Sequence, residues 1–540
     1  MGGEIMHLYR PTRARLQNVS GVPSREALSV LNNPPYPGAP MPPVGPEDWP
    51  WPRGFLWGTQ AASTQEEGGG TITPDGKKIG DPIDNNFIEA VRKEPWHVAD
   101  RSIPLPGLNE WNRLGEHIDE LQALGCNADA FSIDWSRIEP VDGGPFDDQA
   151  MAHYLRKIDL DIANGLEPII TLLHYAIPQW LAEKGGILAP EAVERFERFS
   201  RYVVEKVGDR DIRYWNTLNE PNALAGMSYG MGEWPPFEKN PFKFFEAMGA
   251  TLRLHAAGAR AIREVQAERG KTAMISIAHN MRPFHPHHKW NPLDWLVAKI
   301  PDYTINHWFI DSVQAGGVIK PWGVEPIEGL KDSFDWIGLN YYVRDVMKFK
   351  VGGSRFGVAE VVRDPALPVT TYPDDNTYDP DGVYETLMDL WGQFHLPIMI
   401  TEYGPCDTTH RAPNGELVDE LRPRYLIDFA ADLHHAMDRG VEVLGAMLWA
   451  RTDNWEWTAG ERPKFGLISF DWASGAREFK FSAKVFRRLR LGVPAAWRTA
   501  QNEQNPVERD PYSRAAAERA GLPGPASQPA ERAGQGLGAA

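Results

Sequence analysis

Eight short apolar runs of strand type, separated by amphipathic stretches, restrict the fold of this chain more than any other feature. The runs are GFLWGTQ from Gly54, ADAFSIDW from Ala128, EPIITLLHY from Glu167, IRYWNTLNE from Ile212, TAMISIAHN from Thr272, WIGLNYY from Trp336, PIMITEY from Pro397 and VLGAMLWA from Val443. Strand-type runs that alternate with helical stretches are typical of repeated βα units on a parallel sheet. Eight such units predict an α/β protein with a closed (β/α)8 barrel.

The stretches between the runs have the periodicity of helices. In the first of them, apolar residues from Leu114 to Leu124 fall on one face, and the pattern ends at Gly125. Glycine is common at the left-handed position that follows a helix. The next two helical stretches end in the same way, before Gly165 and Gly208.

Composition divides the chain into one large body and two extensions. Residues 31–46 are dense in proline, and the segment after Pro494 is rich in alanine, glycine and glutamate without a period. Such segments do not bury enough apolar surface to fold alone. We therefore predict a disordered or extended N-terminal extension over residues 1–50, a single catalytic TIM-barrel domain over residues 51–491, and a disordered tail over residues 495–540.

Charge and hydropathy exclude several kinds of partner. The chain has 540 residues with a formal net charge of -17, which argues against nucleic acid because phosphate binding needs clustered Lys and Arg. No stretch reaches the roughly 18 apolar residues of a membrane span. The N-terminus lacks the apolar core of a secretory signal, and the chain has 2 cysteines. We therefore expect a cytoplasmic protein, whose oligomeric state the sequence leaves open.

Polar residues and tryptophan gather where the predicted strands end. By itself, NEP at the end of WNTLNEP also suits a loop that caps the next helix. However, catalytic groups of such barrels lie at the carboxyl ends of the strands, and these ends deliver two carboxylates, Glu220 and Glu402. Two facing carboxyls can cleave a glycosidic bond, because one can protonate the leaving oxygen while the other attacks or activates water. The other side chains at these ends are Gln65, His174, Asn219, Asn340, Tyr342 and Trp449, and such a set suits the hydroxyls and C–H faces of a sugar.

Six segments carry a resemblance to a known family. They are FLWGTQAASTQEEG, FSIDWSRIEP, TLLHYAIPQWL, TLNEP, ITEYG and WARTDNWEWTAGERPKFGL. In order and spacing they resemble the family 1 glycoside hydrolases, the β-glucosidase and β-galactosidase group, over about residues 51–490. The resemblance implies a retaining exo-β-glycosidase that acts by double displacement on small β-glycosides and needs no metal or organic cofactor.

The resemblance also implies a role for each site residue. Glu220 would be the acid/base and Glu402 the nucleophile, with a hydrogen bond from Tyr342. The substrate-binding residues implied are Gln65, His174, Asn219, Asn340, Trp449, Glu456, Trp457 and Phe465. Because Glu456 would repel a phosphate, a neutral glucoside or galactoside is favoured over a 6-phosphorylated sugar.

Two departures from the family pattern bear on the chemistry. Ala130 stands where the family normally has an arginine close to the nucleophile, and a cation there would lower the pKa of Glu402. Arg451 stands where relatives usually have an apolar residue, two positions after Trp449. We therefore hypothesise that Arg451 partly replaces the missing cation, the alternative being that it contacts a loop carboxylate. A second function stays open, a catalytically weakened barrel that binds sugars. Tyr175 and Tyr403, in place of the usual Trp and Asn, are milder changes that put substrate preference in doubt.

Overall fold

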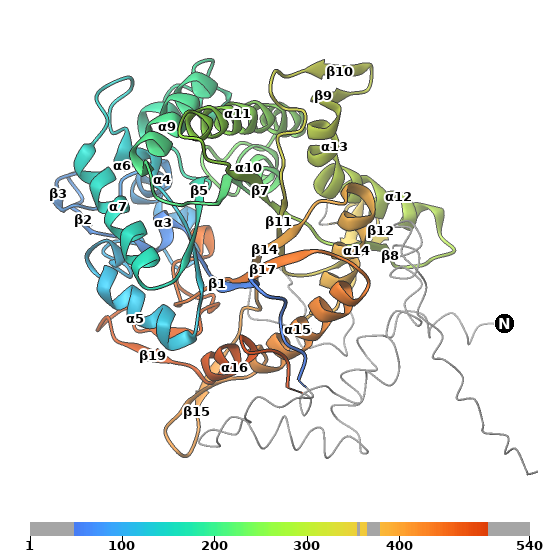
Figure 1. Cartoon of the computed structure of the whole chain (residues 1–540). Coiled ribbons are helices and arrows are strands. Elements are labelled where there is room, and N and C mark those ends of the chain that lie inside the picture. The colour runs from blue at the N-terminus through green and yellow to red at the C-terminus, as the bar shows by residue number, and fades with distance from the viewer. Residues whose placement is uncertain (1–47, 354–356, 364–377, 495–540) are drawn as a thin grey trace, which may run out of the picture.

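The computed structural model describes residues 48–353, 357–363 and 378–494 (Figure 1). Apart from residues 48–50, the two predicted extensions lie outside the described residues. Trp49 is described, and its backbone N–H donates to the carbonyl of Val493 at 2.9 Å. The described part of the chain thus joins its two ends in one antiparallel bridge.

A closed barrel of eight parallel strands forms the centre of the molecule, as the sequence predicts. The strands are β1 (Leu56–Ala61), β4 (Ala128–Ser132), β5 (Glu167–Leu173), β6 (Tyr214–Asn219), β7 (Met274–Asn280), β11 (Ile337–Tyr341), β14 (Ile398–Tyr403) and β17 (Val443–Leu448). They are hydrogen-bonded in the order β1-β17-β14-β11-β7-β6-β5-β4, and β4 closes on β1. Each of the eight predicted runs forms one of these strands.

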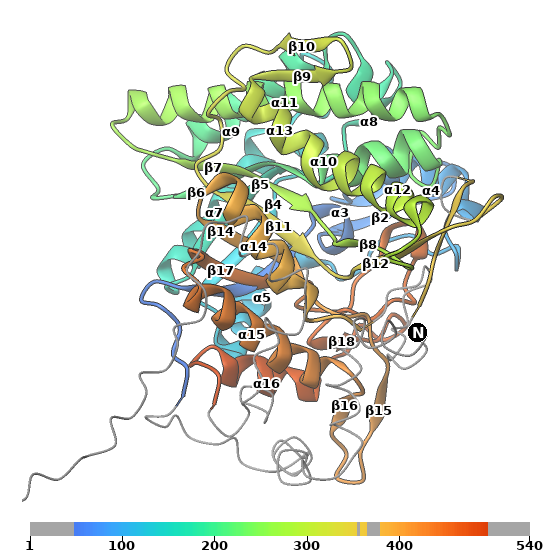
Figure 2. The same cartoon turned by 90° about the vertical axis from the view of Figure 1, so that its right-hand side faces the viewer.

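Helices connect the strands and surround the barrel (Figures 1 and 2). Among the described residues, the longer ones are α4 (Asn86–Lys93), α5 (Leu114–Leu124), α7 (Asp148–Ala163), α9 (Ala192–Val207), α11 (Pro241–Glu268), α12 (Pro292–Pro301), α13 (Trp308–Ala315), α14 (Gly382–Phe394), α15 (Arg422–Asp438) and α16 (Phe481–Leu489). The shorter ones are α3 (Ser63–Glu66), α6 (Trp135–Ile138), α8 (Gln179–Ala182) and α10 (Pro221–Ala225). Helix α5 ends as predicted, with Gly125 in the left-handed conformation at φ +77°.

The described part of the chain also has five small sheets, which lie in the loops. They pair β2 (Gly70–Ile72) with β3 (Lys78–Gly80), β9 (Gly317–Lys320) with β10 (Gly323–Pro326), β15 (Thr409–Arg411) with β16 (Leu417–Asp419), β18 (Ile468–Phe470) with β19 (Arg477–Phe479), and β12 (Asp345–Phe349) with both β8 (Phe284–Pro286) and β13 (Ala359–Val361).

Side chains fill the lower interior of the barrel, and larger clusters pack between barrel and helices. The buried members of the interior cluster are Ala128, Ala130, Ile169, Tyr214, Trp336, Met399 and Met447. Ala130 therefore points inward, beneath the carboxyl ends of the strands, as alternation along a strand requires. The interior of the barrel is therefore packed, and it supports the side chains at the carboxyl ends of the strands.

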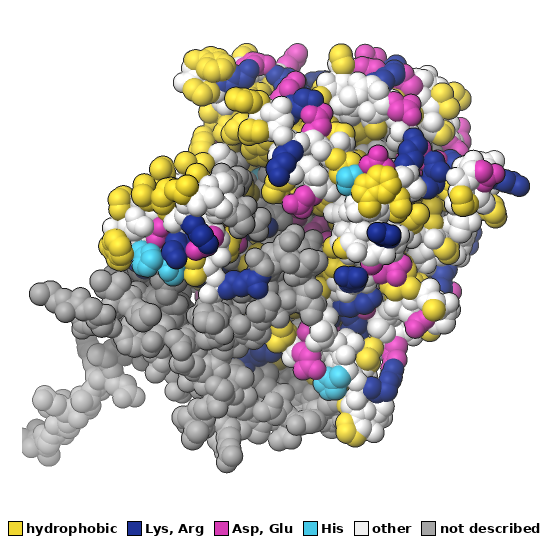
Figure 3. All heavy atoms as spheres, turned by 180° about the vertical axis from the view of Figure 1, so that it is seen from behind, with side chains coloured by type: hydrophobic (Ala, Val, Ile, Leu, Met, Phe, Trp, Pro, Cys, Tyr) yellow, Lys and Arg dark blue, Asp and Glu magenta, His cyan; other side chains and the backbone are white. Residues whose placement is uncertain are grey.

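The outer surface has the mixed character of a folded domain. On the face shown in Figure 3, acidic and basic side chains of the described residues are interspersed rather than gathered by sign. Among the described residues, no helix has the length and apolar character needed to cross a bilayer.

Candidate active site

Two buried glutamates meet at the carboxyl end of the barrel. Glu402 lies on β14, in register with Asn340 of β11 across a β-bulge. Glu220 follows the last residue of β6 and has φ +41°, a left-handed conformation that a non-glycine residue rarely adopts. The charge of Glu220 acts directly on Glu402, so the two predicted catalytic residues share one site.

Glu220 accepts three hydrogen bonds. The Tyr175 hydroxyl donates to Oε2 at 2.5 Å. The side-chain amides of Asn280 and Asn340 donate to Oε1 at 2.9 and 2.8 Å. Asn340 is itself oriented by Thr401, whose hydroxyl donates to the Asn340 carbonyl at 2.6 Å. The carboxyl group of Glu220 is therefore fixed from three sides.

Glu402 has fewer partners than Glu220. The Tyr342 hydroxyl donates to Oε2 at 2.6 Å, whereas Oε1 is buried and has no hydrogen-bond partner among the described residues. Burial and the facing charge of Glu220 raise the pKa of Glu402 well above its usual range, although the hydrogen bond from Tyr342 and the nearby amide of Asn340 oppose this. With Ala130 on β4, no arginine from that strand offsets the rise.

A second polar group lies beside this pair, between α3 and the loop after β17. The Gln65 amide donates to the Trp455 carbonyl at 2.8 Å and to Glu456 Oε2 at 3.1 Å. Burial raises the pKa of Glu456 to about 8, against hydrogen bonds from Gln65 and Trp449. The Gln65 carbonyl has no partner among the described residues, so it is available to a hydroxyl donor.

His174 and Asn219 link the surroundings of Glu220 to those of Glu402. The Asn219 amide donates to His174 Nε2 at 3.0 Å, and the same nitrogen lies 3.9 Å from Glu402 Oε1. Burial lowers the pKa of His174 to about 3, so its ring is neutral and Nε2 is the acceptor. The Asn219 carbonyl in turn accepts from Asn340 at 3.1 Å.

Aromatic rings form the remaining wall. The ring of His174 lies 6.0 Å from that of Trp449 and 6.1 Å from that of Trp457, which starts a short 3-10 helix over Trp457–Ala459. The ring of Phe465 lies 6.1 Å from that of Tyr342. The three aromatic residues predicted for substrate binding are therefore all near the carboxylate pair.

The hypothesis that Arg451 replaces the missing cation beside Glu402 needs correction, because its guanidinium pairs with other carboxylates. It contacts Glu66 and Glu110 at 3.1 Å each and forms a further ion pair with Glu120. Among the described residues it has no ion pair with Glu402. The strand β17 ends at Leu448, so alternation no longer holds at position 451 and the side chain leaves the face that carries Trp449.

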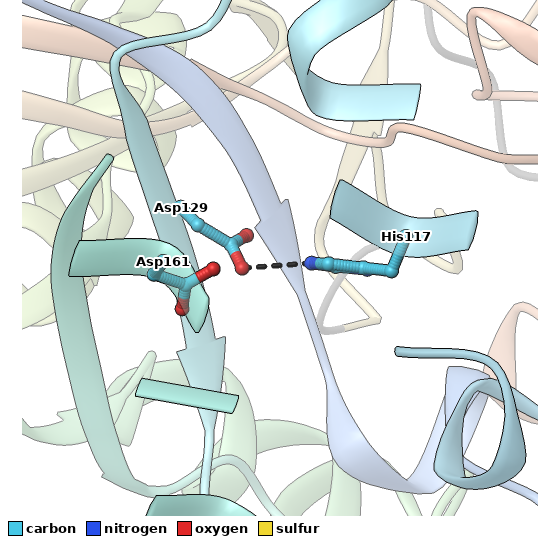
Figure 4. A group of neighbouring side chains, drawn as sticks. All are labelled: His117, Asp129 and Asp161. Atoms are coloured by element: carbon cyan, nitrogen blue, oxygen red, sulfur yellow. Dashed lines mark hydrogen bonds and ion pairs between the residues drawn. The ribbon is translucent and has the colours of Figure 1, made fainter. Parts of the chain in front are cut away.

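A cluster of potential metal ligands lies outside the barrel, behind β4 (Figure 4). His117, Asp129 and Asp161 are close enough to hold one ion. The ammonium of Lys157 already contacts all three groups. It pairs with Asp129, lies 3.0 Å from His117 Nε2, and lies 3.6 Å from Asp161. An internal cation thus occupies the position where a metal ion would bind.

Sequence reasoning did not identify Tyr175 and Asn280 as partners of Glu220. Asn280 is the last residue of β7, so the rule that selected the other strand ends could have found it. Tyr175 ends the predicted run EPIITLLHY, so the same rule includes it, but the rule does not show which group its side chain contacts. Its contact depends on a left-handed backbone at φ +64°, which composition and periodicity do not reveal.

A closed parallel barrel with two facing carboxyls, surrounded by amides and tryptophans, defines a glycoside hydrolase. The family model described as "Glycosyl hydrolase family 1" matches residues 48–491. The chain belongs to glycosyl hydrolase family 1, as its sequence motifs predict.

Relatives support this assignment over most of the chain. Beta-glucosidase A of Thermotoga maritima is 28% identical over 444 residues, covering 80% of this chain and 96% of the relative. Beta-galactosidase of Sulfolobus acidocaldarius is 27% identical and covers 82% of this chain and 96% of the relative. The solved beta-glucosidase from Thermotoga maritima in complex with glucoimidazole has a TM-score of 0.73 at 26% identity, covering 82% of this chain and 98% of that structure.

Proposed function

We propose that this enzyme is a retaining exo-β-glycosidase that hydrolyses small neutral β-glucosides or β-galactosides. The observation that carries the proposal is the open Oε1 atom of Glu402, buried in the same site as Glu220. Tyr342 fixes the other oxygen of this carboxylate. Such an arrangement leaves one oxygen free to approach the anomeric carbon of a bound sugar.

In the first half of the proposed reaction, Glu402 Oε1 attacks the anomeric carbon, and the glycosidic C–O bond breaks as Glu220 donates a proton to the departing oxygen. A covalent glycosyl-enzyme forms on Glu402. In the second half, Glu220 takes a proton from a water molecule, which attacks the same carbon and releases Glu402. Two inversions leave the β configuration unchanged. A sugar hydroxyl can replace water as the acceptor, which would give transglycosylation.

The proposed sugar subsite consists of Gln65, His174, Asn219, Asn340, Trp449, Glu456, Trp457 and Phe465. The Gln65 carbonyl offers an acceptor to a hydroxyl group. In the neutral His174 ring, Nε2 already accepts from Asn219, so Nδ1–H is left as a donor without a partner among the described residues. Some relatives are named for glucosides and others for galactosides, so both sugars belong in the proposal. A 6-phospho-beta-glucosidase of Bacillus subtilis is also a relative at 28% identity. Glu456 has a pKa of about 8, so it would repel a phosphate where it is ionised, at and above that pH.

A panel of aryl β-glycosides, with the anomer of the first product followed by proton NMR, tests this function. We expect hydrolysis of the β-glucoside or β-galactoside, with β-sugar formed before mutarotation. First formation of α-sugar would contradict the retaining mechanism. We further propose a cytoplasmic location, because neither Cys126 nor Cys406 is part of a disulfide in the structure.

The alternative function is a sugar-binding barrel with weakened catalysis. The position of Ala130 favours it, because Glu402 lacks the cation expected from that strand and its pKa is raised. Binding of glucose or galactose in calorimetry, together with no turnover of any aryl glycoside, would support this alternative. Measurable turnover that Glu402→Gln abolishes would exclude it.

A further inference from the structure

A buried ion pair lies next to the proposed sugar subsite. Arg451 Nη2 lies 3.1 Å from Glu66 Oε2, and both side chains are buried. Glu66 belongs to α3, whereas Arg451 belongs to the loop after β17. The pair therefore joins two segments whose contacting residues are 385 positions apart in the sequence.

The same two segments supply polar groups of the subsite. Gln65 precedes Glu66 on α3, and Glu456 lies in the loop that contains Arg451. The Gln65 amide donates to the Trp455 carbonyl at 2.8 Å and to Glu456 Oε2 at 3.1 Å. The position of Gln65 relative to Glu456 therefore depends on how α3 is held against this loop.

Asn454 connects the ion pair to Gln65. The Asn454 amide donates to Glu66 Oε1 at 3.4 Å, and the Asn454 carbonyl accepts from the Gln65 amide at 3.4 Å. Each contact is long and therefore weak by itself, but the two fix a direction. A side-chain amide carries its donor and its acceptor on different atoms, so the contact with Glu66 turns the Asn454 carbonyl toward Gln65. The carbonyl of Gln65 then remains for a sugar hydroxyl.

Further carboxylates hold the guanidinium of Arg451 in place. It lies 3.1 Å from Glu110 and forms an ion pair with Glu120, and Arg477 pairs with the same two carboxylates. Burial raises the pKa of Glu66, whereas the charge of Arg451 lowers it. Arg451 thus occupies Oε2 of Glu66 and leaves Oε1 facing Asn454. A site whose supporting groups are fixed in this way keeps its geometry when a ligand binds.

We propose that Arg451 and Glu66 are positioning residues that set the direction of the Gln65 side chain, and that they thereby control how the enzyme discriminates between β-glucosides and β-galactosides. The inference rests on the proposed function and assigns Arg451 a role beyond the stability of the fold. Glucose and galactose differ in the configuration of one hydroxyl group. A displaced hydrogen-bond acceptor in the subsite therefore affects the two sugars unequally.

The substitution Glu66→Gln breaks the chain of contacts with little change in volume. A carboxyl group can accept on both oxygens, whereas an amide has one acceptor atom. The new carbonyl should stay with Arg451, because a charged donor makes the stronger hydrogen bond. Its NH2 group then faces the NH2 group of Asn454. Because two donors repel, Asn454 is turned or displaced, and Gln65 loses one of its acceptors.

The test measures kcat/KM for an aryl β-glucoside and an aryl β-galactoside that share one leaving group. Assays are run at a temperature at which circular dichroism shows each variant to be folded. In Glu66→Gln and in Arg451→Leu, the ratio of the two kcat/KM values should change by about three- to tenfold, the usual effect of losing one hydrogen bond. Arg451→Lys keeps the positive charge and should restore part of the wild-type ratio.

The matched control is Arg488→Leu, which also removes a buried guanidinium. Arg488 lies 2.8 Å from Asp48. Asp48 precedes β1, whereas Glu66 follows it, so this pair lies away from the end of β1 that carries the subsite. Loss of Arg488 should lower the midpoint of thermal unfolding and leave the ratio of the two kcat/KM values at its wild-type level.

Two outcomes would overturn the inference. One is a wild-type ratio in folded Glu66→Gln, which decides the question even where Arg451→Leu does not fold. The other is an equal change of the ratio in Arg488→Leu, which would indicate a general effect of lost stability. The proposed function is judged separately, because failure of the wild type to hydrolyse any aryl β-glycoside would reject it. In that case the dissociation constants of glucose and galactose, measured by calorimetry, take the place of the kinetic ratio.

Discussion

The hydroxyl of Tyr342 donates to Oε2 of Glu402 at 2.6 Å and leaves Oε1 of the same carboxylate free of partners among the described residues. One oxygen is thus anchored and the other is available to substrate. Such an arrangement restricts rotation of the carboxylate and presents a defined attacking atom. The proposed nucleophile is positioned by Tyr342, although the arginine of the family pattern is absent.

Replacing Tyr342 by Phe should remove this anchor. We expect kcat/KM to fall by about 10- to 100-fold, the usual effect of losing a hydrogen bond to a charged group. The pKa of Glu402 should rise further, because the phenol stabilises its ionised form. Since Glu402 must be ionised to attack, the acid limb of the pH profile should move to higher pH. An acid limb at the wild-type position would contradict the role given to Tyr342.

Restoring the missing cation beside Glu402 should move the acid limb of the pH profile to lower pH. Gln60 of β1 is in register with Ala130 of β4, so the two side chains share the inward face and Gln60 competes for the space of an arginine. In the double variant Gln60→Ala/Ala130→Arg, a nearby guanidinium should lower the pKa of Glu402 by about 1 to 3 units. Activity should then persist to lower pH.

The matched control for this variant is Gln60→Ala/Ala130→Met, which has similar bulk without charge. Both proteins are assayed on one aryl β-glycoside across the acid range. If the acid limb lies at the same pH in the Arg and Met variants, a charge at position 130 does not change the pKa of Glu402.

Arg451 should matter for stability instead of for the ionisation of Glu402. Removing it leaves Glu66, Glu110 and Glu120 without a cation that they share. Breaking a buried ion pair from one side typically costs about 3–5 kcal/mol. Arg451→Leu should therefore lower the midpoint of thermal unfolding markedly, while the acid limb of activity stays in place.

The control for Arg451 is Arg411→Leu, because Arg411 pairs with Glu478 on the surface. An exposed pair contributes about 0–1 kcal/mol, so this midpoint should change little. Equal midpoints for the two variants would mean that the buried network contributes no more than a surface contact. A shifted acid limb in Arg451→Leu would revive the compensation hypothesis.

Glu456 should discriminate against phosphorylated sugars in a pH-dependent way. Burial raises its pKa to about 8, so it is largely protonated at pH 7 and becomes charged as the pH rises through 8. A 6-phosphate is already ionised above pH 7. The ratio of kcat/KM for an aryl β-glucoside to that for its 6-phosphate should therefore increase between pH 7 and 9. Glu456→Gln should abolish this increase, and a pH-independent ratio in the wild type would contradict the assignment.

The barrel could be predicted from sequence because alternation of strand and helix patterns depends on local physics. Each apolar run is buried on both faces, so the run marks the length of the strand. Glu220 and Glu402 stand where two of these runs end, and could therefore be predicted to lie at strand ends. The prediction for Arg451 failed because it assumed that strand alternation continued beyond Leu448, where β17 ends. Tyr175 was underestimated because its contact with Glu220 depends on a left-handed backbone and on three-dimensional packing.

The roles of the two carboxyls are tested most directly by the anomer of the azide product formed by glycine variants. In Glu402→Gly, azide should replace the missing nucleophile and attack the aryl β-glycoside once, giving the α-glycosyl azide. In Glu220→Gly, the glycosyl-enzyme still forms on Glu402, and azide should displace it to give the β-glycosyl azide. NMR distinguishes these products. The reverse pair of anomers, or turnover of Glu402→Gly without azide, would contradict the assignment of Glu402 as nucleophile and Glu220 as acid/base.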